Sequence, residues 1–371
     1  MKINPVELRH VLHQNPELSF YEFETTGLLI DSIKRLKNAD KVVIHTPYKT
    51  GLLVEYTCNQ KGYSLFRADI DALPIKEKNE IEFKSKNNYM HACGHDVHTS
   101  ILFDFLQDVL DAGIQKNILF LFQPAEESGG GAMEFFNTGI FNNYNIENAF
   151  ALHVTDDYAK GTIASTKGVL FASSLEVNIN FEGISSHVAF PAEGKNAFNA
   201  LRLFVDTVDR MPRNISEPLV FGMGKITAGE VRNITPGFAR LEGTMRGLSS
   251  NKVLQYYKMI EEILDGISQI TGVKIKCEQG SNYPEFIVDN ELYNKLFPAL
   301  SAKYNFIDCG YKMTGEDFGF ISHQYPSFMF WLGTFDGTRS GLHNPNFLPG
   351  DDIIAIGKSV FHKILNEILS P

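Results

Sequence analysis

The side chains most able to do chemistry lie in the stretch His91-Ala-Cys-Gly-His-Asp-Val-His98, which holds three histidines and a cysteine. Thiolate and imidazole groups bind transition metals, and together they favour Zn²⁺ or neighbouring metals over Mg²⁺. Cys93 and His95 are two residues apart, so in an extended loop both side chains leave the same side of the backbone. The stretch therefore predicts a metal site just before a helix. The alternative is a helix-entry loop whose histidines only cap the helix and form hydrogen bonds.

A pair of glutamates, Glu126 and Glu127, follows closely after the apolar run 118–122. Carboxylates at the end of a strand lie where open α/β sheets place their ligand sites. Neighbouring side chains point in different directions, which suits a divided role: one glutamate binds a metal and the other accepts a proton. The alternative is a solvated pair at the positively polarised start of a helix.

Two aspartates and two single histidines complete the set. Asp69 and Asp71 alternate with Ile70 at the end of another apolar run, so both can face one side and orient a metal-bound ligand. A plain strand-to-turn pair is the alternative. On their own, His153 and His343 fit core or loop positions better than a metal site.

The elements that must position these residues alternate between strands and helices. Helical spacing of apolar residues predicts two helices within residues 6–36, and further helices over 100–112 and 132–137. Short apolar runs bounded by Gly, Pro or charged residues indicate strands buried on both faces, at 51–56, 63–66, 118–122, 149–154 and 328–332. This order predicts an α/β catalytic domain with a mostly parallel sheet.

The middle of the chain has a different pattern. Apolar residues alternate over 174–181, as in a strand with one solvated face. The elements that follow are a helix at 196–211, strands at 219–227 and 238–246, a helix at 250–270 and a strand at 273–278. The order β-α-β-β-α-β is that of a ferredoxin-like unit. We therefore predict an inserted α+β domain at 173–282, which splits the metal-binding domain into residues 1–172 and 283–371.

Composition limits the partners. With 34 Lys+Arg against 44 Asp+Glu, the formal net charge of −10 argues against nucleic acids and anionic membranes as partners. No apolar run in the sequence approaches the about 18–20 residues of a membrane span. The start of the chain has charges and Pro5 before any apolar core of a signal peptide. The four cysteines are few and widely spread, which suits a reducing compartment. We expect a cytoplasmic enzyme.

Taken in order, these motifs resemble the aminoacylase/carboxypeptidase family of two-metal amidohydrolases, a family of metallopeptidase-like α/β proteins. The matching stretches are 13–17, 67–74, 91–98, 124–127, 153, 187–191, 315–318 and 343–347. Cys93 stands where most members carry an aspartate ligand, which is typical of a subgroup that includes hippurate hydrolases, auxin-conjugate hydrolases and N-acetyldiaminopimelate deacetylases. The stretches 119–127, 313–319 and 328–333 look most like the last of these.

The resemblance implies one or two divalent metal ions (Zn, Co, Mn or Ni) per subunit. The metal ligands that it implies are Cys93, His95, Glu127, His153 and His343. Glu126 would be the general base. Asp69 stands where many relatives carry a histidine ligand, and Asp71 matches a supporting aspartate. Which of the two aspartates matters more stays open at this point.

The resemblance further implies a homodimer formed through the inserted domain, which would serve as lid and dimerisation domain. His187 matches a family histidine that donates a hydrogen bond to the substrate from the partner subunit; by itself it fits a surface position. Asn233 and Arg246 are donors suited to a substrate carboxylate, or else strand-end residues. Glu316 would meet a substrate amine.

The expected activity is metal-dependent hydrolysis of a small N-acyl amino acid. The first hypothesis is deacetylation of N-acetyl-LL-diaminopimelate to LL-diaminopimelate and acetate in lysine biosynthesis. The nearest alternative is a broader N-acyl-amino-acid amidohydrolase, of the hippurate-hydrolase type, or a dipeptidase. A non-catalytic binding protein on the same fold is the third hypothesis, against which the intact Glu126–Glu127 pair argues.

Overall fold

The computed structural model describes residues 2–58, 61–211 and 218–369, and the chain divides into two compact units. Unit 1 comprises Met1–Leu170, Phe286–Tyr311 and Asp317–Pro371. Unit 2 comprises Phe171–Glu285 and the short returning segment Lys312–Glu316. The periodicity of residues 312–316 does not indicate that this last segment belongs with the middle of the chain.

Within the described ranges, unit 1 contains an eight-stranded mixed sheet in the order β1-β2-β4-β3-β5-β14-β6-β13. Its strands are β1 (Val42–His45), β2 (Leu52–Tyr56), β3 (Tyr63–Asp69), β4 (Asn117–Gln123), β5 (Ile146–Ala159), β6 (Ile163–Ser165), β13 (Phe306–Asp308) and β14 (Ser327–Phe335). The central strands β4, β3, β5 and β14 pair in parallel, whereas β1, β2 and β4 pair antiparallel. The mostly parallel centre confirms the predicted α/β class.

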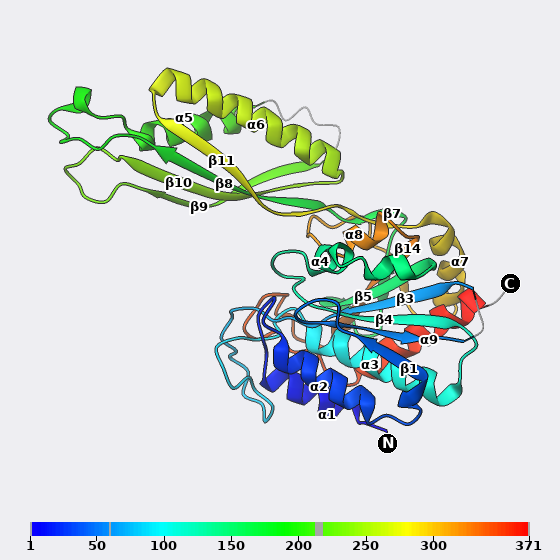
Figure 1. Cartoon of the computed structure of the whole chain (residues 1–371). Coiled ribbons are helices and arrows are strands. Elements are labelled where there is room, and N and C mark those ends of the chain that lie inside the picture. Colours follow the sequence, from blue (N-terminus) through cyan, green and yellow to red (C-terminus); the bar gives the residue numbers. More distant parts are fainter. Residues whose placement is uncertain (1, 59–60, 212–217, 370–371) are drawn as a thin grey trace. The chain divides into compact units, whose positions relative to one another are not determined.

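Helices cover both faces of this sheet, with α1, α2, α3 and α9 on one face and α4 and α8 on the other (Figure 1). The helices of unit 1 are α1 (Pro5–Gln14), α2 (Phe23–Lys34), α3 (His95–Ala112), α4 (Gly131–Asn137), α7 (Asn290–Ser301), α8 (Gly319–Ser322) and α9 (Ile353–Leu369), with 3₁₀ turns at η1 (Ala39–Lys41) and η2 (Ile140–Asn143). A separate two-stranded pair joins β7 (Gly168–Phe171) and β12 (Phe286–Val288). Among the described residues, no helix has both the length and the apolar composition needed to cross a bilayer.

The covered centre of the sheet explains the apolar runs of the sequence. Every residue of β4 is buried, and so is every residue of β3 except the first. Strands covered on both faces favour apolar side chains throughout, so polar residues in them stand out. Asp69 ends β3 and Gln123 ends β4, and the two pair directly across the ladder. These parallel strands therefore present buried polar groups at their carboxyl ends, where open sheets bind ligands.

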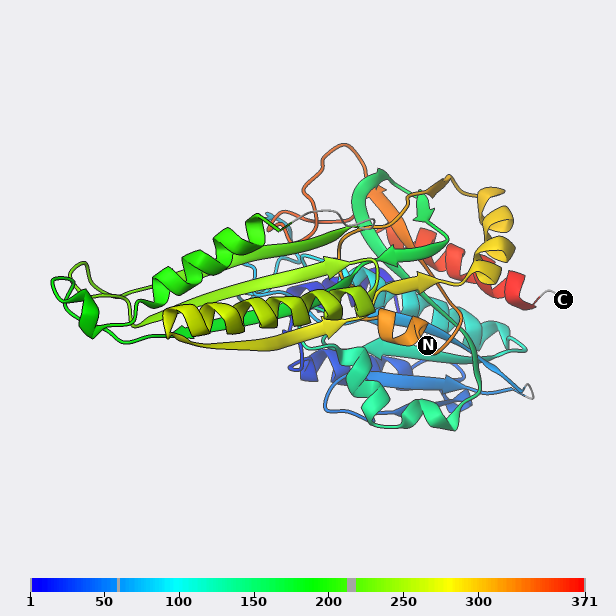
Figure 2. The same cartoon turned by 90° about the horizontal axis from the view of Figure 1, so that it is seen from above.

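Unit 2 is a four-stranded antiparallel sheet in the order β11-β8-β10-β9, counted over the described residues. Its elements are β8 (Ser173–Glu182), η3 (Pro191–Glu193), α5 (Ala197–Asp209), β9 (Leu219–Ala228), β10 (Phe238–Gly247), α6 (Ser250–Thr271) and β11 (Lys274–Tyr283). Figures 1 and 2 show α5 and α6 on the same face of this sheet. Leu175, Val177, Ile179 and Phe181 are buried in the core of this unit while the residues between them are partly or fully exposed, which confirms the predicted one-sided strand and the ferredoxin-like order.

Candidate metal centre

A left-handed glycine turns the chain between Cys93 and His95. Gly94 has φ +86°, and a Cβ atom at this position would lie 2.4 Å from Val154 Cγ2, so a larger residue would clash with β5. Helix α3 begins immediately afterwards at His95, five residues before the predicted start at 100. The extended loop expected from the spacing is therefore wrong, and the turn at Gly94 takes its place.

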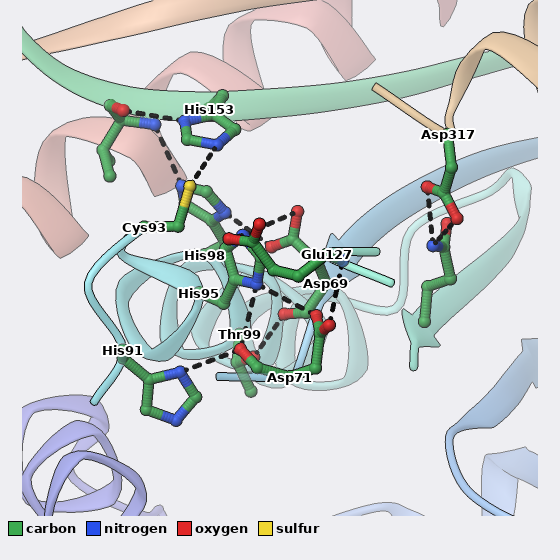
Figure 3. Close-up of polar contacts among 12 residues, drawn as sticks. Asp69, Asp71, His91, Cys93, His95, His98, Thr99, Glu127, His153 and Asp317 are labelled. Atoms are coloured by element: carbon green, nitrogen blue, oxygen red, sulfur yellow. Dashed lines mark hydrogen bonds and ion pairs between the residues drawn. The ribbon is translucent and has the colours of Figure 1, made fainter. Parts of the chain in front are cut away.

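Three side chains from three segments converge in unit 1 (Figure 3). Cys93 Sγ lies 3.3 Å from His153 Nε2, and the potential ligand atoms of Cys93, His95 and His153 all lie within 4.8 Å of one another. Tetrahedral ligands at about 2.0–2.3 Å from a zinc ion are about 3.3–3.8 Å apart. The loop, the start of α3 and the middle of β5 thus hold a thiol and two imidazoles at a spacing that fits a metal ion.

A second group shares Cys93 with the first. Cys93, Glu127 and His343 also offer ligand atoms within 4.8 Å of one another. Glu127 Oε1 lies 3.4 Å from His343 Nε2 and 3.8 Å from His95 Nε2. The donor atoms therefore surround two neighbouring positions, as a pair of cations would require.

The hydrogen bonds of the imidazoles leave the inward-facing nitrogens available. His95 Nδ1–H donates to the Asp71 carbonyl oxygen at 3.0 Å and to Asp71 Oδ1 at 3.1 Å, and His153 Nδ1–H donates to the Val154 carbonyl oxygen at 2.7 Å. Within the described residues, His95 Nε2 and Glu127 Oε1 are buried without a hydrogen-bond partner. Buried polar atoms left in this state are unfavourable, and a bound cation would satisfy both. The residues present therefore fit a metal.

Asp71 connects two of the potential ligands. Its Oδ1 accepts from His95, and its Oδ2 accepts from the Glu127 backbone N–H at 3.0 Å and from the Ser19 hydroxyl at 2.7 Å. The side chain is fully buried. Asp71 thus fixes the tautomer of one imidazole and the backbone position of Glu127.

Asp69 has a different set of partners. Val154 N–H donates to His98 Nε2 at 2.9 Å, so the proton of this imidazole is on Nδ1, which donates to Asp69 Oδ1 at 2.6 Å. Both ring nitrogens of His98 are therefore hydrogen-bonded, one to Asp69 and the other to the β5 backbone directly after His153. The other Asp69 oxygen accepts from Arg67 Nη1 at 2.8 Å.

Arg67 is the buried cation behind this arrangement. Besides Asp69 it donates to Gln123 Oε1 at 2.9 Å and to Asp317 Oδ1 at 2.9 Å. The sequence reasoning assigned no role to Arg67, His98 or Asp317. Arg67 had a visible signal, since an arginine inside an apolar strand needs acidic partners. No signal in the spacing separates His98 from His95.

The electrostatics of the centre favour a cation. Burial alone would lower the pKa of His95, but the charges of Asp69, Asp71 and Glu127 and the hydrogen bond that His95 donates to Asp71 raise it to about 10. Burial raises the pKa of the Cys93 thiol well above its usual value, and the charges of Glu127 and Glu126 add to this rise. Burial of Cys93 and the negative charge around both groups therefore favour their protonated forms, and binding of a metal would require release of these protons.

The loop that carries His343 is held by a residue that sequence reasoning missed. Asp156, three residues after His153 in β5, accepts from the backbone N–H groups of Ser340 at 2.6 Å and Gly341 at 2.8 Å. His343 itself has a left-handed φ of +60°, and its N–H donates to the Ala92 carbonyl oxygen at 2.9 Å. Because residues 156 and 340 are far apart in sequence, no local pattern links them.

In unit 2, the predicted residues fall into two groups. His187 bridges to Ile234, and Val188 N–H donates to the Asn233 carbonyl oxygen at 3.2 Å, so His187 and Asn233 lie on paired loops beside the start of β10. Arg246 is near the other end of β10, where its Nη1 donates to the Met313 carbonyl oxygen at 3.2 Å.

The segment Lys312–Glu316 packs beside Arg246 in unit 2. A Cβ atom on Gly315 would meet Ser174 Oγ at 2.6 Å and Arg246 Nη1 at 3.5 Å, so the chain packs closely there. Eight residues of strand separate Phe238 from Arg246, which corresponds to about 26 Å. Unit 2 therefore does not bring Asn233 and Arg246 together.

A buried ionic network anchors the first turn of α3 to α1. Asp96, next to His95, accepts from Arg9 Nε at 3.1 Å and from His13 Nδ1 at 2.9 Å, and His13 Nε2 donates to Glu77 at 3.1 Å. Burial would lower the pKa of His13, but the hydrogen bonds and charges of Asp96 and Glu77 raise it to about 9. The imidazolium form of His13 is therefore part of the folded protein at neutral pH.

This network predicts a pH dependence of stability. The pKa of His13 is higher in the folded chain than the ordinary histidine value of 6.5, so its contribution to stability is fully present below pH 6.5 and is lost as pH rises through about 9. The contribution is roughly 3 kcal/mol at most. We expect the free energy of unfolding, measured with urea at fixed metal concentration, to fall more steeply over this window in the wild type than in His13→Gln. His10→Gln, on the same helix, is the control and should keep the wild-type slope. Equal slopes in all three proteins would contradict the assignment.

Comparison with known proteins identifies the family. The sequence model of "Peptidase family M20/M25/M40" matches residues 65–367. An N-acetyldiaminopimelate deacetylase of Exiguobacterium sibiricum is 38% identical over 94% of this chain and 95% of its own length. One from Pediococcus pentosaceus is 35% identical over 99% of this chain and 98% of its own length.

The solved structures agree with this result. The Bacillus subtilis YxeP protein, described as a dinuclear metal-binding peptidase of the M20 family, superposes with a TM-score of 0.81 at 26% identity, over 98% of this chain and 97% of its own. Similarity of this extent, together with the family match over both flanks and the insertion, confirms the resemblance drawn from the motifs. The chain belongs to peptidase family M20/M25/M40.

Proposed function

We propose that this protein is a metal-dependent amide hydrolase that converts N-acetyl-LL-diaminopimelate and water to LL-diaminopimelate and acetate, a step of lysine biosynthesis. The observation that carries the substrate is the similarity, along nearly the whole chain, to relatives named N-acetyldiaminopimelate deacetylase. The chemistry has separate support in Cys93, His95, Glu127, His153 and His343, whose ligand atoms surround two neighbouring positions; three of these residues are buried, Glu127 is partly buried and His343 is exposed.

These five residues would hold one or two divalent ions. A divalent metal, when bound, would supply a Lewis acid that lowers the pKa of water to about 7. The mixed sulfur, nitrogen and oxygen donors suit Zn, Co, Mn or Ni. Asp71 keeps the Nε2 lone pair of His95 directed inward, and Val154 does the same for His153.

Glu126 is the residue that we assign to proton transfer. It is largely buried, and its carboxylate lies within 4.8 Å of the ligand atoms of His95 and Glu127. As water adds to the acetyl carbon, Glu126 accepts a water proton, and it then returns this proton to the nitrogen of the breaking C–N bond. The products are acetate and the free amine. Glu127, which points to a different set of partners, is left to bind metal.

We further propose that the site is completed in a homodimer formed through unit 2. Support comes from the separation of about 26 Å between the loops of His187 and Asn233 and the position of Arg246, because a compact substrate cannot span it. In a dimer, the Arg246 end of unit 2 could contribute to the active site of its own subunit, and the His187–Asn233 end to the active site of the partner subunit. Apolar side chains that a partner could cover are exposed around the His187 loop, at Ile184, Val188, Phe190, Ile234 and Phe238.

In this arrangement the partner subunit's His187 donates a hydrogen bond to the carbonyl oxygen on which negative charge develops. Arg246 and Asn233 are the donors that we assign to the substrate carboxylates, and Glu316 is assigned to an amine. A reducing, cytoplasmic location is also proposed, with support from the small number and wide spacing of the four cysteines in the sequence.

A substrate panel tests the proposal. Metal-free protein is reconstituted separately with Zn, Co, Mn and Ni, its metal content is measured, and each form is assayed with N-acetyl-LL-diaminopimelate, hippurate and simple dipeptides. We expect kcat/KM for N-acetyl-LL-diaminopimelate to exceed that for hippurate by on the order of 10²-fold or more, since a site built for polar groups rejects substrates that lack them. Turnover of hippurate or dipeptides alone would favour the broader amidohydrolase. Absence of any turnover with every metal would favour a binding protein.

A further inference from the structure

The turn that carries Glu126 has a strained backbone. Ala125 has φ +54°, in the left-handed region that side chains with a Cβ atom disfavour. Such a conformation persists only where the surroundings enforce it, and it often marks a functional position. Both backbone groups of Ala125 are paired: its carbonyl oxygen accepts from Gly131 N–H at 3.0 Å, and its own N–H donates to Glu22 Oε1 at 2.8 Å.

Glu22 is a carboxyl group with no exposure to solvent. Its Oε2 accepts from the Thr50 hydroxyl at 2.7 Å, so each oxygen has one donor. Burial raises the pKa of Glu22 to about 7, and the charge of Asp71 adds to the rise. Burying a carboxyl group is unfavourable, and an apolar side chain would serve packing better. We infer that a hydrogen-bond acceptor is needed at position 22, and that filling the space is not the main role of this side chain.

Glu22 accepts a hydrogen bond from the backbone N–H of Ala125, the residue directly before the proposed base Glu126. On the other side of Glu126, the Glu127 N–H is held by Asp71 Oδ2 at 3.0 Å. The N–H groups of Ala125 and Glu127, the residues before and after Glu126, are thus held by two buried carboxyl groups: Glu22, directly before α2, and Asp71, two residues after β3. A shift of the Ala125 backbone would move Glu126 without moving Cys93 or His95, which lie on a separate loop and helix.

We propose that Glu22 is a positioning residue that holds Ala125 in its left-handed conformation and thereby sets the direction of the Glu126 carboxylate. This inference rests on the proposed function, with Glu126 as the proton acceptor. Enzyme rates are sensitive to misplacement of a reacting group by about 1 Å, so loss of this acceptor should act on turnover more than on binding.

The test compares two replacements of nearly equal size. Glu22→Gln keeps an oxygen that can accept from Ala125 N–H and an amide that can donate to Thr50, whereas Glu22→Met keeps the volume and removes the acceptor. We expect Glu22→Met to lower kcat by about 10–100-fold with metal content and KM near wild type. Glu22→Gln should retain kcat within about threefold of wild type, since the hydrogen bond survives.

Two further variants separate positioning from general damage. Ala125→Gly accepts φ +54° without strain, so adding it to Glu22→Met should recover part of the lost kcat and stability, also if Glu22→Met alone folds poorly. Thr50→Val, which removes a hydrogen bond from the same carboxyl group without touching Ala125, should change kcat by less than about threefold. Hydrogen exchange of the Ala125 amide should be faster in Glu22→Met than in Glu22→Gln.

Wild-type protein assayed in parallel distinguishes the two proposals. If wild type hydrolyses none of the substrates, the proposed function fails, while amide exchange at Ala125 still tests the contact. The positioning role is overturned if wild type is active and Glu22→Met matches its kcat. It is equally overturned if Glu22→Gln and Glu22→Met lose kcat alike, or if the loss follows metal content.

Discussion

Replacing Glu126 with glutamine is expected to abolish turnover while the protein keeps its metal. The side chain keeps its size, but an amide cannot accept the water proton, so the loss should approach the upper end of the about 10²–10⁴-fold that general bases contribute. Glu126→Ala should behave in the same way. Both predictions are checked by steady-state kinetics on the best substrate of the panel together with metal analysis of the purified variant.

The neighbouring residue supplies the matched control. Glu127 Oε1 lies 3.4 Å from His343 Nε2 and 3.8 Å from His95 Nε2, so Glu127→Gln should lose metal affinity as well as activity. Glu126→Gln would then be inactive with its metal retained, whereas Glu127→Gln would be inactive with its metal lost. Retained turnover in Glu126→Gln, or equal metal loss in both variants, would show that the division of roles between Glu126 and Glu127 is wrong.

His187→Ala is expected to lower kcat by about 10²–10³-fold with metal content unchanged, because in the proposed mechanism the missing imidazole donates to the developing oxyanion. His187 lies in unit 2, and every proposed metal ligand lies in unit 1. The measurement is again kinetics beside metal analysis, with the oligomeric state followed by light scattering. Loss of metal in this variant would contradict the role that we assign to His187.

Mixing inactive variants tests whether His187 acts across the proposed dimer. A heterodimer of Glu126→Gln and His187→Ala has one site with a wild-type Glu126 and the partner subunit's His187. Random reassociation of equal amounts should therefore restore about a quarter of the wild-type activity. Glu126→Gln mixed with Glu127→Gln is the control and should stay inactive, since each of its sites carries a substitution in unit 1. No recovery in the first mixture would place the action of His187 within its own subunit.

Much of the architecture could be predicted from local pattern. The buried strands β3 and β4 were visible as apolar runs because helices cover both faces of the sheet. The alternation in β8 was visible because only one face of that sheet is covered. Short strands such as β6 and β13 gave no signal, since three residues carry no period. The early start of α3 at His95 was missed because it depends on the turn at Gly94 against β5.

The sequence by itself determined which chemistry the chain can support. A thiol, several imidazoles and paired carboxylates in the order of a known family predict a metal-dependent hydrolase, and residue type alone carries that information. The sequence does not distinguish Asp69 from Asp71, because the two aspartates have the same residue type and, two positions apart in an extended segment, face the same side.

Only the tertiary structure separated them. Asp71 holds His95 and the Glu127 backbone, whereas Asp69 joins His98 to Arg67. The same holds for Glu22, whose partner lies more than a hundred residues away at Ala125. Hydrogen bonds between distant segments depend on how strands and helices pack, and packing of that kind leaves no trace in the spacing of residues along the chain.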